Sequence, residues 1–192
     1  MDYETKSKAE IRNYIRAERQ KQVPAQLKDW SATLCNHLLK HPVVSHAEII
    51  GAYYPLPDEP DIRPLILHLY QQGKTILLPH VINDTEMTFL PYDGEEKLNE
   101  GAFHIMEPKA KDISYREMVG NIIFLIPGMA FTTNGKRLGR GKGFYDRFLA
   151  QTEANMHKKN NTIYKIGICY PFQILDNIPT DINDIMMDEV IF

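Results

Sequence analysis

The chain has 192 residues, of which 43% are hydrophobic and 24% charged, a balance that suits one globular domain over residues 1–192. Its formal net charge of −3 argues against general nucleic-acid binding, because proteins of that class usually carry a strongly basic domain. Any attraction for phosphate must therefore come from local clusters of cations.

The sequence also argues against several other classes of protein. Two cysteines far apart, Cys35 and Cys169, do not make a disulfide scaffold, and the sequence has neither a CxxC nor an HExxH motif to suggest zinc. No apolar run approaches the ~20 residues that a membrane span needs, and residues 1–6 are too polar for a secretory leader. We expect a cytoplasmic monomer that binds neither nucleic acid nor membrane.

Two helices are predicted at the start of the chain. Apolar residues at helical spacing form a narrow stripe within residues 6–22. Pro24 suits the first turn of a second helix, in which leucines recur at helical spacing until Pro42 ends the pattern.

Beyond these helices, short apolar runs alternate with helical patterns. We expect one helix over residues 62–69, ended by Gly73, and another that starts near Gly143. The expected strands are 48–54, 75–81, 87–92, 121–126 and 162–169. This alternation predicts an α/β layered fold with a largely parallel sheet. The polar run 155–161 is expected to be an exposed loop.

The most informative stretch follows the apolar run 121–126 and combines glycines with cations. These residues are Gly135, Lys136, Arg137, Gly139, Arg140, Gly141, Lys142 and Gly143. Glycines let the backbone approach a ligand closely, and a helix that starts near Gly143 would direct its free amides at an anion. Ligands of such folds bind beyond the carboxyl ends of strands. We therefore predict a loop that grips nucleotide phosphates, with a flexible, solvated basic loop as the alternative.

The loop matches neither of two common phosphate-binding motifs. In Walker A a Ser or Thr follows the Lys, whereas Gly143 follows Lys142 here. The dinucleotide fingerprint needs GxGxxG, whereas Gly139, Gly141 and Gly143 spell GxGxG.

The run 137–146 closely resembles the signature of the 5-formyltetrahydrofolate cyclo-ligase family, also called 5,10-methenyltetrahydrofolate synthetase. Phe144 stands where that family usually has tyrosine. The resemblance extends over nearly the whole chain. The other matching segments are Lys8-x-x-x-Arg12, 54–59, 101–108 and the acidic stretch 183–190.

This resemblance implies a three-layer αβα sandwich with a mostly parallel central sheet, like that of sugar-phosphate isomerases and CoA transferases. It also implies an ATP-dependent cyclo-ligase that converts 5-formyltetrahydrofolate to 5,10-methenyltetrahydrofolate, with Mg²⁺, and releases ADP and phosphate. A formyl amide is a poor electrophile, so phosphorylation must first turn its oxygen into a leaving group. A loop of amides and cations suits that chemistry.

The family's functional residues map onto matching positions of this sequence. For ATP these are Lys8, Arg12, Arg137, Leu138, Gly139, Arg140, Gly141, Lys142, Gly143, Phe144 and Tyr145. For folate they are Tyr54, Glu59, Arg140, Gly141, Lys142, Gly143 and Phe144. Arg140 and Lys142 are the implied catalytic residues, and Asp146 and Asp184 the implied magnesium ligands, with Asp188 a rival for Asp184.

The residues by themselves leave alternatives open. Lys8 and Arg12 share one helix face that could simply be solvated, and Asp146 could be an acid favoured by the helix dipole. Tyr54 and Glu59 could belong to a proline-rich surface turn. A sugar-phosphate isomerase or a non-catalytic nucleotide sensor would also use such a loop. No histidine is assigned to catalysis.

Overall fold

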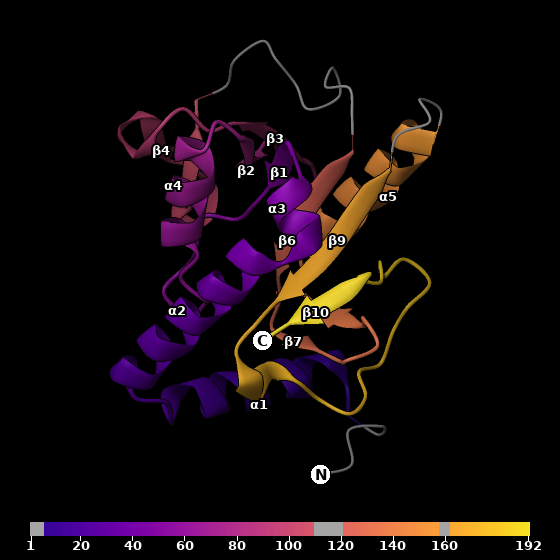
Figure 1. Ribbon diagram of the computed structural model, residues 1–192. Helices are drawn as coiled ribbons and strands as arrows, with labels where there is room; N and C mark the ends of the chain where they lie inside the picture. Colours follow the sequence, from indigo (N-terminus) through magenta and orange to yellow (C-terminus); the bar gives the residue numbers. More distant parts are fainter. Residues whose placement is uncertain (1–5, 110–120, 158–161) are drawn as a thin grey trace.

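The computed structural model describes residues 6–109, 121–157 and 162–192 (Figure 1). Its centre is a six-stranded sheet of order β10-β9-β6-β1-β2-β3. The strands are β1 (Ile49–Gly51), β2 (Thr75–Val81), β3 (Met87–Pro91), β6 (Ile122–Pro127), β9 (Ile163–Ile168) and β10 (Glu189–Ile191). All neighbours run parallel except β2 and β3. The predicted α/β class with a mostly parallel sheet is confirmed.

Helices cover both faces of this sheet (Figure 1). On one face lie α2 (Pro24–Lys40), α3 (Pro42–His46) and α4 (Arg63–Gln71), whose apolar side chains share a core with Ile50 and Ile76. On the other face, α5 (Phe144–His157) packs Phe148 and Leu149 on Phe124. These three layers match the sandwich that the family resemblance implied.

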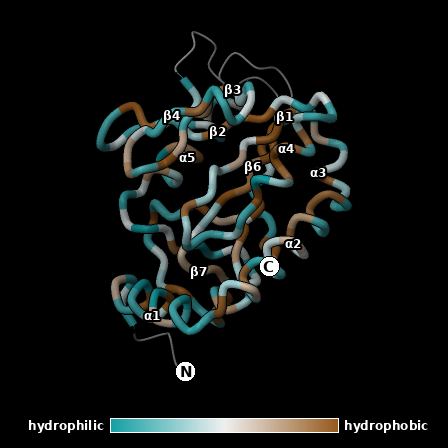
Figure 2. The backbone as a smooth tube through the Cα atoms, turned by 90° about the vertical axis from the view of Figure 1, so that its left-hand side faces the viewer, coloured by the Kyte–Doolittle hydropathy of each residue, from teal (hydrophilic) through white to brown (hydrophobic). Residues whose placement is uncertain are grey.

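The buried strands explain why this layering is stable. All six residues of β6 are buried, as expected for a parallel strand covered by helices on both sides. Figure 2 shows hydrophobic residues gathered on the central strands and hydrophilic residues toward the outside. Within the described residues, every helix is too short or too polar to cross a membrane.

The first helix and two small hairpins complete the fold. α1 (Lys8–Gln20) starts at a capping box between Ser7 and Glu10 and packs Ile11 and Ile15 on a separate small core. The hairpins are β4 (Leu98–Glu100) with β5 (Met106–Pro108) and β7 (Ala130–Phe131) with β8 (Arg137–Leu138). Short 3₁₀ turns are η1 (Glu95–Lys97), η2 (Ala102–His104) and η4 (Pro171–Gln173).

Several boundaries differ from the sequence-based expectations. The expected strand 48–54 is paired only at Ile49–Gly51, because the chain then leaves the sheet toward a cavity. The expected loop 155–161 was wrong at its start, since α5 continues to His157; residues 158–161 lie outside the described residues. The short α3, β10 and both hairpins were not anticipated.

The strand order creates a binding crevice between two neighbouring strands. From β1 the chain passes to β2 on one side, whereas β6 lies on the other side of β1. Such a topological switch point leaves a crevice beyond the carboxyl ends of the strands, where α/β proteins bind ligands. The segments that leave β1 and β6 at this edge are 52–60 and 128–143.

Candidate active site

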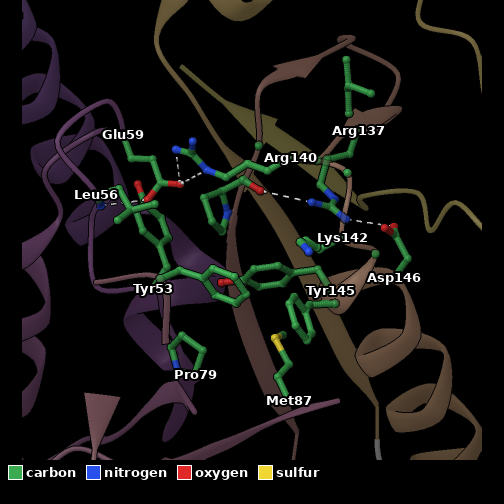
Figure 3. Close-up of a pocket in the computed structure, with 18 of the residues that line it drawn as sticks. Tyr53, Leu56, Glu59, Pro79, Met87, Arg137, Arg140, Lys142, Tyr145 and Asp146 are labelled. Carbon is green, nitrogen blue, oxygen red and sulfur yellow. Dashed lines mark hydrogen bonds and ion pairs between the residues drawn. The ribbon is translucent and has the colours of Figure 1, made fainter. Parts of the chain in front are cut away.

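A cavity of about 540 Å³ lies at this edge of the sheet (Figure 3). Its walls come from α1, from the segments that follow β1 and β6, from the end of β2 and from the β4–β5 hairpin. Every ATP, folate and metal residue inferred above lines this cavity, from Lys8 to Asp184. The rival acid Asp188 does not; it accepts a hydrogen bond from the backbone amide of Lys165 at 2.7 Å.

The glycine loop, residues 139–143, forms one side of the cavity directly before α5. Gly141 has a φ of +107° and Gly143 a φ of +68°, conformations that favour glycine. Arg12 Nε donates a hydrogen bond of 2.8 Å to the Gly139 carbonyl, which fastens α1 to the loop. Two segments that matched the family, Lys8-x-x-x-Arg12 and the glycine loop, are therefore in direct contact in the structure.

The cations in and beside this loop have quite different surroundings. Arg137 is buried: its side chain is 3% exposed and its Nη2 lies 2.9 Å from Asp146 Oδ1. Arg140 Nη2 lies 2.5 Å from Asp58 Oδ1 and 3.0 Å from Glu59 Oε1. Arg137 and Arg140 are thus already neutralised by carboxylates of the chain itself (Figure 3).

Lys142 differs from both arginines. Within the described residues it has no carboxylate partner within salt-bridge distance, and its Nζ lies 5.9 Å from the centre of the Phe103 ring. It is exposed and lines the cavity. Of the loop's cations, Lys142 is the one whose charge stays available for an anionic ligand.

Two carboxylates at the cavity suit a metal ion shared with phosphate. Asp146 and Asp184 side chains are 19% and 20% exposed. Asp146 Oδ1 accepts from Arg137, and Asp184 Oδ2 accepts from Lys8 at 2.5 Å. Their other oxygens make no further hydrogen bond within the described residues. Burial works to raise the pKa of Asp184, but the Lys8 ammonium and the Asp181 amide hold it below its ordinary value.

No group of three or more potential metal-binding side chains occurs among the described residues. Mg²⁺ does not need one, since it commonly takes one or two carboxylates and completes its shell with phosphate oxygens and water. The pair Asp146 and Asp184 therefore fits a magnesium ion that arrives with a triphosphate, and fits a resident structural metal poorly.

Glu59 and Tyr54 mark another part of the wall. Glu59 accepts hydrogen bonds from Arg140 and from the Leu56 amide at 3.0 Å, and burial raises the pKa of its carboxyl group despite the arginine. The Tyr54 hydroxyl donates to Glu95 Oε1 at 2.5 Å. Burial together with this bond raises the Tyr54 pKa to about 12. Tyr54 can therefore offer its ring to the cavity, whereas its hydroxyl already has a partner.

Sequence reasoning missed several lining residues. Tyr53 is buried and donates to the Pro60 carbonyl at 2.9 Å, and Asp181 shares Lys8 with Asp184. Phe103 and Glu107 come from the β4–β5 hairpin, in a segment that matched the family without an assigned role. Only Asp181 had a local signal, an acid three residues before the candidate ligand Asp184.

A glycine- and cation-rich loop at the switch point of a mostly parallel sheet is an arrangement at which α/β proteins commonly bind phosphorylated small molecules. The chain belongs to the 5-formyltetrahydrofolate cyclo-ligase family, whose sequence model matches residues 4–192. It is therefore a cyclo-ligase, an enzyme that closes a ring by forming a carbon–nitrogen bond, and its substrate is a folate.

Individual relatives agree with this membership. The chain is 28% identical to 5-formyltetrahydrofolate cyclo-ligase of Haemophilus influenzae over 97% of its own length and 98% of the relative's. It is 27% identical to the Escherichia coli K12 enzyme, over 92% and 95% of the two chains. The structure resembles that of Aquifex aeolicus 5,10-methenyltetrahydrofolate synthetase, with a TM-score of 0.77, 30% identity and coverage of 95% and 88%.

Proposed function

We propose that this enzyme converts 5-formyltetrahydrofolate to 5,10-methenyltetrahydrofolate in a reaction that consumes ATP, requires Mg²⁺ and releases ADP and phosphate. One observation carries the ATP part of the proposal. The glycine loop, the α5 N-terminus and the cations of α1 converge on one cavity that Asp146 and Asp184 also line. Backbone amides at a helix N-terminus, a lysine without a carboxylate partner in the described part of the chain and two carboxylates are what a magnesium triphosphate needs.

In this proposal the glycine loop and α1 hold the triphosphate. Arg12 already contacts the loop through Gly139, so the two elements can grip phosphate from neighbouring positions. Asp146 and Asp184 would hold Mg²⁺, which would neutralise phosphate charge when bound. Arg137 acts through Asp146: its buried guanidinium orients that carboxylate toward the cavity.

Lys142 is the proposed catalytic cation. The γ-phosphoryl group passes to the formyl oxygen, and negative charge must be stabilised while it moves. The second folate nitrogen then attacks the formyl carbon, the carbon–oxygen bond breaks, and the oxygen leaves as part of phosphate. The proton of the attacking nitrogen leaves the amine in the same step and ends on phosphate. Lys142 has no competing carboxylate among the described residues, so its ammonium group can stabilise the negative charge of the phosphoryl group during the transfer.

Arg140 connects the proposed folate and phosphate regions. It belongs to the glycine loop, and it binds Glu59 through both Nε and Nη2. We propose that Glu59 and the Tyr54 ring contact the folate. Arg140 would fix the position of the Glu59 carboxylate relative to the glycine loop. Phe144, which also matched a folate-binding position, faces the β4–β5 hairpin, with its ring centre 6.0 Å from that of Phe103.

The decisive experiment follows the formyl oxygen. Enzyme, Mg-ATP and 5-formyltetrahydrofolate labelled with ¹⁸O in the formyl group should give methenyl absorbance, one ADP per product and one ¹⁸O in the released phosphate. Unlabelled phosphate together with normal methenyl formation would contradict the phosphorylation step. Absence of methenyl product would contradict the function itself.

Two further proposals concern the protein as a whole. We propose a cytoplasmic location, in keeping with Cys35 and Cys169, which are both free and buried. A monomeric state likewise remains a prediction, which sedimentation of the purified enzyme would test.

A further inference from the structure

Glu107 has different partners from the other carboxylates of the cavity. Those others each lie within salt-bridge distance of a lysine or arginine: Glu59, Asp146, Asp181 and Asp184. Glu107 instead faces a histidine, with His80 Nδ1 at 2.9 Å from its Oε2. Its side chain is only 6% exposed. Within the described residues, Glu107 is thus a deeply buried cavity acid whose contact is not with a permanent cation.

The two oxygens of Glu107 are held differently. Oε2 accepts a hydrogen bond of 3.4 Å from the Val81 amide and carries the His80 contact, which lacks hydrogen-bond alignment. Oε1 is buried and accepts no well-aligned hydrogen bond among the described residues, although the backbone amide of Ala102 lies near the carboxylate. Buried acceptors in proteins nearly always have a partner, because losing hydration without replacement is unfavourable. A carboxylate in a cavity wall with incomplete hydrogen bonding therefore points to a donor on a ligand.

The hairpin fixes this carboxylate in place. Glu107 lies on β5, and its backbone is paired with that of Asn99 on the neighbouring strand β4. A Cβ atom at Gly101 would lie 2.4 Å from Glu107 Cδ, so the chain passes against the carboxylate with no space between them. A side chain held this firmly can select a ligand by geometry as well as by charge.

The surroundings of Glu107 indicate what kind of ligand it would bind. The neighbouring lining residues are mostly apolar: Pro79, Val81, Met87, Phe103 and Ile105. An apolar wall with one fixed carboxylate suits a flat ring that carries N–H groups. A reduced pterin has such donors on its ring and amino group. A triphosphate has only acceptors and would be repelled by the carboxylate.

We propose that Glu107 is a substrate-binding residue whose carboxylate accepts a hydrogen bond from an N–H group of the folate's pterin ring. This inference rests on the proposed function, since it takes 5-formyltetrahydrofolate as the substrate. It adds a second carboxylate contact to the one proposed for Glu59.

The test compares two substitutions with a matched control. Glu107→Leu removes both carboxylate oxygens, whereas Glu107→Gln keeps one oxygen that can accept a hydrogen bond but removes the charge. Glu100→Gln changes another glutamate of the same hairpin, one that contacts His104, is 61% exposed and does not line the cavity. For each protein one measures the Kd of 5-formyltetrahydrofolate by calorimetry without ATP, the KM for each substrate, and the melting temperature.

Glu107→Leu should raise the folate Kd and KM at least tenfold while the KM for Mg-ATP changes less than twofold. Glu107→Gln should show a smaller rise, about threefold to tenfold, because a neutral acceptor makes a weaker bond than a charged one. Glu100→Gln should match the wild type. If Glu107→Leu does not fold, the Gln variant decides by the same readouts.

Three results would overturn the inference. Folate binding within twofold of the wild type in the folded variants would make Glu107 a structural residue. A rise confined to the KM for Mg-ATP would assign Glu107 to the nucleotide base. Equal losses for both substrates would indicate a general distortion of the cavity. Failure of the wild-type enzyme to form methenyl product would instead contradict the proposed function.

Discussion

The glycine loop and the hairpin wall of residues 101–108 face the same cavity but are constructed differently. The loop offers backbone with positive φ at Gly141 and Gly143, next to cations. The wall offers an aromatic ring, Phe103, and a buried carboxylate, Glu107. Phosphate recognition by backbone amides leaves its mark on a short run of sequence. Recognition of a ring by side chains depends on tertiary contacts, which a local motif does not reveal.

The largest expected effect concerns Lys142. Lys142→Ala should lower kcat about 10²–10³-fold, the usual cost of losing one electrostatic donor at a transition state, and should leave the folate Kd within a few-fold. Rapid measurement of methenyl formation and calorimetry of folate binding check both parts. Lys136→Ala is the control, since Lys136 binds Asn177 at 2.6 Å and does not line the cavity. Near-normal turnover in Lys142→Ala would contradict the catalytic role proposed for this lysine.

The contrast between Lys142 and its neighbours shows how far the sequence could be interpreted. The glycines, cations and following helix predicted the loop, because backbone torsion and helix dipoles act within a few residues. The same pattern could not predict which of these cations have carboxylate partners in the folded chain. Arg137 is buried against Asp146, and Arg140 is paired with Glu59 from a segment about eighty positions away in the chain. Charge type is local information, whereas charge neutralisation is a property of the folded structure.

The elements of the fold likewise divide into those that the local sequence predicts and those that it does not. The continuous apolar run of β6 and the periodic helices were predictable because burial on both faces requires them. The β4–β5 hairpin was missed, since its strands have three residues each and little periodicity. Glu107 was therefore visible in the sequence only as part of a matching segment, and its incomplete hydrogen bonding within the described residues became apparent only in three dimensions.

The next largest effect concerns the metal. Asp184→Asn should raise the Mg²⁺ concentration for half-maximal activity about tenfold, since a neutral carbonyl is a weaker ligand than a carboxylate. Asp188→Asn should not, because Asp188 binds Lys165 and lies outside the cavity lining. Magnesium titrations of both variants at saturating ATP and folate test this. A shift in Asp188→Asn alone would make Asp188 the ligand.

A glycine of the loop, Gly141, and one that precedes it, Gly135, separate an expected ligand role from a structural role. Gly135→Ala would place a Cβ atom 2.3 Å from the Met187 carbonyl oxygen, at a φ of +92°. Gly141 also has positive φ, but the closest atom to its Cβ would be Arg12 Cζ at 3.4 Å. Backbone strain costs roughly 1–3 kcal/mol at either site, and the clash adds to it only at Gly135. Thermal melts should show the larger loss for Gly135→Ala, and ATP binding the larger loss for Gly141→Ala. The reverse order would contradict this assignment.

The smallest expected effect tests whether the hairpin wall assists the loop. The Phe103 ring is 5.9 Å from Lys142 Nζ and 6.0 Å from the Phe144 ring, yet Phe103 is 51% exposed. A cation–π contact at an exposed site contributes about 0.5–1 kcal/mol, which corresponds to roughly two- to fivefold. Phe103→Leu should therefore lower kcat/KM for the folate by about two- to fivefold, because Lys142 loses this contact but keeps its charge. Steady-state kinetics and a thermal melt suffice to measure this. A fall in kcat as large as that of Lys142→Ala would show that the wall positions Lys142, the proposed catalytic residue, and the two regions would then work as one unit.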